Sequence, residues 1–380
     1  MMRWVAVRML VGDTAKYLGL VFGISFATLL MAQQISIFVG IMARTASQVS
    51  DIRDASLWVM DSKTRFIDEA PGLADNDLHR VRGVPGVEWA VQLYKGQVTA
   101  RLADGEYRAL ILFGLDDGTL VGGPQEMIVG ELSDLRQPDA VIVDKAGYEY
   151  MWPGAPYEIG REFELNDRRA RLVGICKASA PFTTLPVMYT RISTVRGFVP
   201  QQRQVMNYIL AEPLEGEDPE EVCRRIDEAT GLMALTQRQF FWKTIRYFLS
   251  TTGIPVNFGI TIALGFIVGA AITGQTFYLF TLENLKQFGA LKAMGVTNLR
   301  ILGMVLLQAM IVGALGYGIG IGLTAAFFES TKNITHLAGL YLNPYAALGV
   351  GVAVLMIISL SALTASIKVL VLEPAVVFRG

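Results

Sequence analysis

The residue types that usually carry catalysis or metal binding are sparse in this sequence. The two histidines, His79 and His336, lie far apart, and the two cysteines, Cys176 and Cys223, form no CxxC or other metal-ligand spacing. There is no GxxxxGK[ST] phosphate-binding loop and no nucleophile elbow, and the acidic residues are scattered. The sequence therefore predicts no metal site, no directly bound cofactor and no enzyme activity of the chain by itself.

The cysteines leave two interpretations open. Both lie in the polar central part of the chain, and a disulfide between Cys176 and Cys223 is permitted if that part is outside the cytoplasm. The alternative is a pair of small, unpaired, buried residues.

One short segment has the composition of a docking surface. Residues 281–301, TLENLKQFGALKAMGVTNLRI, are too polar to be buried in lipid and too short to form a domain. Apolar residues recur at every third position, at Leu282, Leu285, Phe288, Leu291 and Met294. The polar residues Glu283, Lys286, Gln287 and Lys292 lie mostly elsewhere. We expect a short amphipathic helix that ends in a cap at Gly295, and a plain interfacial turn is the alternative.

This segment lies between two of four stretches that are long enough to cross a bilayer. Of the 380 residues, 52% are hydrophobic and 18% are charged, and the mean hydropathy is +0.41. A bilayer core about 30 Å thick requires roughly 20 apolar residues in a helix. The stretches that meet this requirement are 17–42, 256–282, 299–328 and 345–371. The first is too long for a cleaved signal peptide, so we expect it to remain as a membrane helix.

Basic residues set the predicted orientation of these helices. Three flanks carry an excess of them: Arg3, Arg8 and Lys16 against Asp13; Lys286, Lys292 and Arg300 against Glu283; Lys368 and Arg379 against Glu373. Basic flanks of membrane helices face the cytoplasm. We therefore place an interfacial helix at 1–16, a coupling helix at 283–298 and the tail 372–380 in the cytoplasm. The loop 329–344 and a large domain at 43–255 then lie outside.

The large domain has the features of a soluble α+β fold. Residues 43–250 hold 24 of the 33 Lys and Arg and 30 of the 34 Asp and Glu, and this mildly acidic balance gives no reason to expect nucleic-acid binding. Strand-like runs occur in 87–115, 140–144, 169–176 and 186–190, and helical segments are predicted at 43–56, 73–83 and 218–230. Residues 43–56 and 236–250 are expected to extend the first two spans as stalks. The predicted fold class is an integral membrane protein with four transmembrane helices and this domain inserted between helices one and two.

The third span is rich in glycine. The run GALGYGIGIG contains two GxxxG spacings, Gly316 with Gly320 and Gly318 with Gly322. Small residues allow helices to approach closely, so we expect tight helix packing here, within a protomer or across a two-fold axis. No Asp, Glu, Lys or Arg lies in the middle of a span, which argues against ion-coupled transport. We expect span glutamines such as Gln308 to bond between helices.

Several of these segments resemble one family. ExxKxxGALKAMG at 283–295 resembles the cytoplasmic coupling segment of ABC-transporter permeases of the MacB and FtsX type. The stretch 140–175 is similar to the family's extracytoplasmic core, and LEPAVVFRG at 372–380 resembles its usual ending. The order of one span, a large domain and three spans also agrees. The chain looks closest to stand-alone permeases resembling DevC, whose ATPase is a separate polypeptide.

The resemblance implies a role for each residue of the coupling segment. The segment would dock in a groove of the ATPase, which would bind ATP and magnesium. Leu285, Phe288 and Leu291 would supply apolar contacts, Gly289 would allow close approach, and Met294 and Gly295 would complete the segment. Glu283, Lys286 and Lys292 would form a polar rim.

The resemblance also implies a permease subunit of an ATP-driven exporter in the inner membrane of a bacterium. The partners would be the ATPase, a second copy of the chain, membrane lipid and, in a two-membrane bacterium, a periplasmic adaptor and an outer-membrane channel. An FtsX-like regulator of cell-wall hydrolases and a lipoprotein-extraction permease are the alternatives.

Overall fold

The computed structural model describes residues 2–69, 71–200, 206–332 and 340–371. The chain divides into two compact units. The membrane unit comprises residues 1–40 and 253–380, and the inserted unit comprises residues 41–252. Each unit is described by itself.

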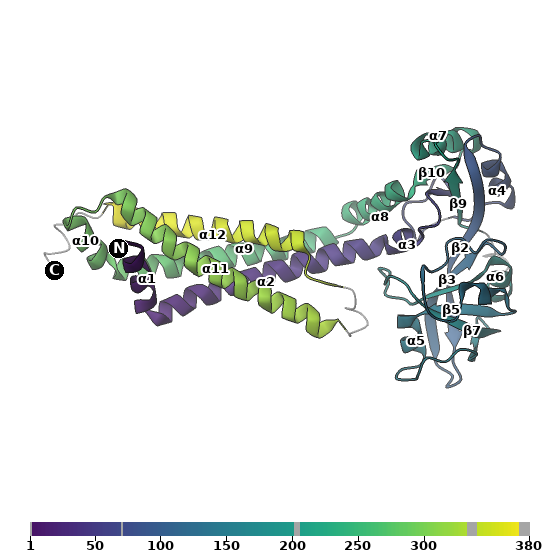
Figure 1. Ribbon diagram of the computed structural model, residues 1–380, viewed down its shortest axis with the longest axis horizontal. Helices are drawn as coiled ribbons and strands as arrows, with labels where there is room; N and C mark the ends of the chain where they lie inside the picture. Colours follow the sequence, from purple (N-terminus) through teal and green to yellow (C-terminus); the bar gives the residue numbers. More distant parts are fainter. Residues whose placement is uncertain (1, 70, 201–205, 333–339, 372–380) are drawn as a thin grey trace. The chain divides into compact units, whose positions relative to one another are not determined.

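The membrane unit is a bundle of long helices, shown in Figure 1. Its described helices are α1 (Met2–Gly12), α2 (Thr14–Thr45), α9 (Ile254–Glu283), α10 (Leu285–Ala293), α11 (Asn298–Thr331) and α12 (Pro344–Val371). Four of them, α2, α9, α11 and α12, are long and apolar enough to cross a membrane. Each of these four contains one of the predicted spans.

The inserted unit is built on a mixed β-sheet. Its described strands are β1 (Leu57–Met60), β2 (Val87–Arg101), β3 (Tyr107–Leu115), β4 (Glu126–Val129), β5 (Ala140–Asp144), β6 (Glu162–Leu165), β7 (Arg168–Lys177), β8 (Val187–Arg191), β9 (Tyr208–Pro213) and β10 (Met233–Thr236). The order is β10-β1-β9-β2-β3-β8-β5-β7-β4, and β6 pairs with β2 and β7. Strand β2 joins two halves of the unit, because its first part pairs with β9 and its second part with β3.

Apolar side chains alternate between the two faces of this sheet, so each face has its own core. In β1, Val59 belongs to one core and Trp58 to the other. Helices α4 (Asp75–Arg82), α5 (Lys145–Met151), α6 (Ile192–Phe198) and α7 (Pro219–Thr230) cover the first face. The second face is covered by α3 (Ser47–Asp51), the 3₁₀-helix η1 (Leu132–Arg136) and α8 (Gln237–Thr251). Both cores are formed by residues of the inserted unit alone.

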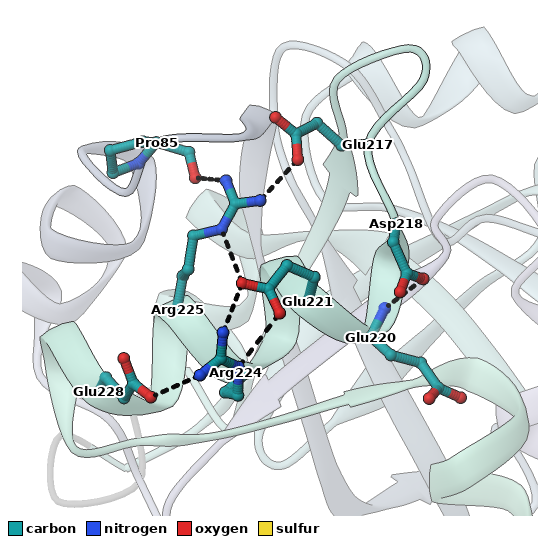
Figure 2. Close-up of polar contacts among 8 residues, drawn as sticks. All are labelled: Pro85, Glu217, Asp218, Glu220, Glu221, Arg224, Arg225 and Glu228. Atoms are coloured by element: carbon teal, nitrogen blue, oxygen red, sulfur yellow. Dashed lines mark hydrogen bonds and ion pairs between the residues drawn. The ribbon is translucent and has the colours of Figure 1, made fainter.

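Helix α7 begins as its sequence predicts. The side chain of Asp218 accepts a hydrogen bond from the backbone N–H of Glu220, with Pro219 in the first turn. Figure 2 shows the charged side chains along this helix. Arg225 pairs with Glu217 at 2.6 Å and donates to the carbonyl of Pro85 at 3.0 Å. This bond fixes α7 to the loop before β2.

The two predicted stalks differ from the structure. The segment 43–56 is helical only to Asp51, because Ile52 is extended and the backbone N–H of Ser56 donates to Glu212 as the chain enters β1. The second stalk is a separate helix, α8, which ends at Thr251, whereas α9 begins at Ile254. Pro255 lies in the first turn of α9, where a missing N–H is tolerated, and it would break a continuous helix.

Candidate functional site

The connection between α9 and α10 is short and well ordered by hydrogen bonds. Asn284 is the single residue between the two helices, and its amide donates to the carbonyl of Phe280 at 2.8 Å. Its own carbonyl accepts from the N–H of Phe288 at 3.0 Å. The end of α9 is therefore tied directly to the first turn of α10.

The predicted stop at Gly295 is confirmed. Gly295 has φ +87°, the left-handed conformation in which glycine has no Cβ penalty. Its N–H donates to the carbonyl of Lys292 at 2.9 Å, and the N–H of Val296 donates to the carbonyl of Leu291 at 3.1 Å. This pair of bonds is a Schellman motif. Leu291 and Val296 also pack against the same core cluster, as such caps commonly do.

The apolar side of α10 faces inward, which corrects the expected partner contacts of Phe288 and Gly289. Phe288 is fully buried in the membrane unit, in one cluster with Phe277 and Phe280, and Gly289 is buried as well. Leu285 and Leu291 are half-buried against that cluster. The periodicity located an apolar face correctly, but this face is used by the chain's own bundle. Phe288 therefore fixes α10 to α9 and α12 rather than offering itself to another chain.

Glu283 of the expected polar rim is engaged within the chain. Glu283, at the end of α9, forms an ion pair with Lys16 of α2, and Lys16 also pairs with Asp13 at 2.6 Å. These contacts connect the beginning of α2 to the end of α9. Lys292 lies half-buried in the last turn of α10.

Some exposed side chains of this region lie outside the predicted segment. Lys286 and Gln287 are exposed on α10, Met294 is 71% exposed at its end, and Leu299 is 78% exposed in the first turn of α11 beside exposed Arg300. We call these five residues the coupling surface. Within the described residues, Lys286 and Arg300 have no ion pair. Leu299 and Arg300 were missed as site residues because an apolar run beginning at 299 reads as the start of a membrane span.

The N-terminal helix is joined to the same unit by a buried glutamine. The side-chain amide of Gln308 in α11 donates to the carbonyl of Ala6 in α1 at 2.8 Å. The predicted interhelical bonding of Gln308 is confirmed. Its side-chain oxygen is buried without a hydrogen-bond partner among the described residues.

The glycines of α11 separate into two sets. A Cβ on Gly316 would lie 2.7 Å from the side chain of Ile24, and a Cβ on Gly320 would lie 2.5 Å from that of Thr28. These two glycines therefore allow α11 to touch α2. Gly318 and Gly322 have no neighbour within 4 Å in the described part of the chain, so the second GxxxG pair makes no packing contact within one protomer.

The two cysteines are free and buried on opposite faces of the sheet. Cys176 of β7 faces the core that contains Trp58, whereas Cys223 of α7 lies in the other core. Two thiols that face opposite sides of a sheet cannot bond without movement of the backbone, so the disulfide interpretation is corrected to two unpaired thiols. Burial raises the pKa of Cys223 to about 12 and raises the pKa of Cys176 further. Neither thiol is therefore prone to ionise.

The described residues contain no group of three His, Cys, Asp or Glu side chains that could hold a metal ion. His79 is exposed on α4. His336 and the ending 372–380 lie outside the described residues.

Two family models match the chain. The MacB-like periplasmic core domain matches residues 17–229, and the FtsX-like permease C-terminal domain matches residues 259–374. The second match contains the coupling surface.

Relatives of similar length are known from bacteria. Two uncharacterized ABC transporter permeases of Mycobacterium tuberculosis are 24% and 25% identical to the chain. The matches cover 83% and 80% of this chain and 81% and 79% of the relatives.

Two solved structures match about half of the chain. The extracellular domain of the ABC-type transporter YknZ from Gram-positive bacteria matches with a TM-score of 0.35 and 16% identity, over 48% of this chain and 98% of that one. The periplasmic region of MacB from Actinobacillus actinomycetemcomitans matches with a TM-score of 0.38 and 12% identity, over 54% of this chain and 96% of that one.

Proposed function

Because the chain belongs to the family of MacB-like and FtsX-like ABC transporter permeases, we propose that it is the membrane subunit of an ATP-driven exporter. ATP and magnesium are bound by a separate ATPase subunit, which docks on the coupling surface. The protein itself performs no bond chemistry. Its task is to carry the motion of the ATPase to the inserted unit.

The observation that carries this proposal is the contrast between the two sides of α10. Its inner side is held by Phe288 in the core of the bundle, whereas Lys286 on α10, Met294 at its C-cap, and Leu299 and Arg300 in the first turn of α11 are exposed. Exposed apolar side chains rimmed by charge are typical of protein interaction sites. An ATPase groove with an apolar floor and acidic edges would complement this surface.

Motion has a continuous covalent route along the chain. The Asn284 hydrogen bonds and the buried Phe288 make α10 move with α9. Helix α9 is preceded by α8 with two residues between them, and α8 buries Phe240 in the inserted unit. A displacement of α10 would therefore reach the inserted unit through α9 and α8.

The remaining features of the proposal follow from the charge pattern and from the family. The basic flanks support a cytoplasmic position of the coupling surface and both termini, and hence a position of the inserted unit outside the inner membrane. We further propose a homodimer that works with two ATPase subunits. In a two-membrane bacterium, a periplasmic adaptor and an outer-membrane channel would complete the export path.

Purification of the intact complex in mild detergent tests the exporter against its two alternatives. An ATPase together with an adaptor supports export. A cell-wall hydrolase in place of the adaptor would identify a regulator, and a bound lipoprotein would identify an extraction permease. Absence of any ATPase would refute the proposal in all its forms.

Substitutions test the docking surface directly. Met294→Asp and Leu299→Asp each place a charge in the apolar part of the interface, where single residues commonly contribute about 2 kcal/mol or more to binding. We expect each to weaken ATPase binding about 30-fold and to abolish stimulated ATP hydrolysis. Leu214→Asp, at a 46% exposed position of the inserted unit, is the matched control. Normal stimulation in both coupling-surface variants would overturn the assignment.

A further inference from the structure

The inserted unit contains a cavity of about 150 Å³ that none of the functions discussed above uses. Its polar wall includes Lys95, Asp68 and Gln97, and its apolar wall includes Ile67, Ile111 and Leu185. Gln97 and Thr183, which also line it, are exposed, so the cavity reaches solvent. A protein cavity of this size is large enough for a benzene-sized molecule.

A buried lysine is the distinctive group of this pocket. The side chain of Lys95 is only 7% exposed and forms an ion pair with Asp68, whose side chain is 26% exposed. The Lys95 ammonium also donates to the carbonyl of Ile67 at 3.1 Å. An ammonium has three N–H donors, and the third has no acceptor among the described residues. Burial lowers the pKa of Lys95, so keeping the charged form there requires compensating partners.

The lysine is held in position by its surroundings. Its backbone N–H donates to the side-chain oxygen of Asn207 at 2.9 Å. The hydroxyl of fully buried Tyr208 donates to the same Ile67 carbonyl at 2.7 Å. The pocket is thus prearranged, and a ligand would not have to order these groups on binding.

The charges of the pocket select the chemistry of a ligand. A simple anion would be attracted by Lys95 but repelled by Asp68. A simple cation would be attracted by Asp68 but repelled by Lys95. A molecule that carries both charges close together satisfies both groups, since Asp68 has lone pairs to spare and Lys95 has a free N–H. A short apolar part of such a molecule would lie against Ile67, Ile111 and Leu185.

We propose that this pocket, the Lys95 pocket, binds a small zwitterion. The anionic group of the ligand meets the ammonium of Lys95, and its ammonium group meets the carboxylate of Asp68. This chemistry is shared by free α-amino acids and by phosphoethanolamine groups, such as those of lipid headgroups.

The walls of the Lys95 pocket are attached to α8 by aromatic contacts. Phe66, next to Ile67, stacks on Tyr247 of α8 with ring centroids 4.5 Å apart, and Phe182, next to Thr183, lies 5.0 Å from Phe248. A displacement of α8 would therefore act on both walls. This coupling, unlike the binding itself, rests on the proposed transport function.

Calorimetric titration of the full chain in maltoside micelles, without any ATPase, tests the binding. The probes are L-valine and phosphoethanolamine. Saturable binding of either supports the site, and the tighter probe indicates the source of the natural ligand. Isovalerate and isobutylamine, which each lack one charge of valine, should bind at least about tenfold more weakly than valine, because each loses a charged hydrogen bond. Equal binding of these controls, or no saturable binding of either zwitterion at millimolar concentration, would overturn the proposal.

Variants assign the binding to this pocket. Lys95→Met should weaken binding at least about tenfold but leaves Asp68 without its partner. The double substitution Lys95→Met with Asp68→Leu removes both charges, and replacing an ion pair by apolar residues of similar size usually preserves folding. The double variant should keep the circular dichroism spectrum of the wild type and lose zwitterion binding.

Lys177→Met, at an exposed lysine paired with Glu126, is the control. Unchanged affinity in the double variant would overturn the assignment. Because no ATPase is present, a failure of the transport proposal would leave this result unaffected.

Discussion

Asp144 makes the stability of the inserted unit depend on pH. It is the N-cap of α5 and is 3% exposed, and one of its side-chain oxygens accepts from the N–H groups of Gly147 and Val187, each at 3.0 Å. Burial raises the pKa of this carboxyl from 3.8 to about 7, and the two N–H bonds oppose the rise. The folded unit therefore holds a proton between about pH 4 and pH 7 that the unfolded chain releases.

The sign and size of the effect follow from linkage. Because the pKa is higher in the folded state, the contribution of Asp144 is fully present below pH 3.8 and is lost as the pH rises towards 7. At about 1.4 kcal/mol per pKa unit, this shift corresponds to a ceiling of about 4 kcal/mol. We expect a loss of about 1–4 kcal/mol across this window, since relaxation and water penetration relieve part of the cost of burying a charge.

Asp144→Asn removes the titration and keeps an oxygen that accepts both N–H bonds. Urea unfolding of residues 41–252, which contain both cores of the inserted unit, should be measured at pH 4.5 and pH 7.5. The wild-type unit should lose more unfolding free energy between these two pH values than the variant does. Asp218→Asn, at the exposed N-cap of α7, reports the general effect of removing one carboxylate. Equal pH slopes for the wild type and Asp144→Asn would refute the reasoning.

Three further outcomes are expected. Gly320→Ala should destabilise the detergent-solubilised protein by about 1–3 kcal/mol through overpacking against α2. Gly322→Ala, with no neighbour within 4 Å in the described chain, should leave the thermal unfolding temperature unchanged or raise it, because alanine is favoured over glycine inside a helix; an equal loss in both variants would contradict the assigned packing. Gly86→Ala should lower the free energy of unfolding in urea more than Gly105→Ala does. Both glycines have positive φ, but only a Cβ on Gly86 would lie 2.7 Å from the side chain of Arg225. Equal losses of unfolding free energy would count against this contact. Mass spectrometry without reductant should find both cysteines as free thiols, and they should react with thiol reagents only after unfolding; a mass lower by two hydrogens would contradict the buried, unpaired state.

The sequence by itself determined the features that arise from local composition. Twenty or more apolar residues can be stable only in lipid or in a deep core, so the four spans were visible without tertiary information. The cap of α7 at Asp218 and the end of α10 at Gly295 were also predictable, because a capping side chain and a left-handed backbone are local requirements. Strands such as β5 were visible as short apolar runs bounded by polar residues.

Tertiary structure alone decided which partner each apolar or small residue meets. A period of three residues shows that α10 has an apolar side, but not whether that side faces its own bundle or another protein. The burial of Phe288 and the exposure of Leu299 therefore could not be derived from spacing. The same holds for Gly320, which touches α2, and Gly322, which touches nothing within the described chain.

The Lys95 pocket and the separation of the two cysteines are also products of the fold. Lys95 lies on β2 and Asp68 lies in the segment between β1 and α4, 27 positions away in the sequence, so they meet only in the folded unit. Cys176 and Cys223 are kept apart because the side chain of Cys176 on β7 faces one side of the sheet, whereas α7, which carries Cys223, covers the other side. Long-range pairing of this kind depends on the register of strands far apart in sequence, which no local pattern records.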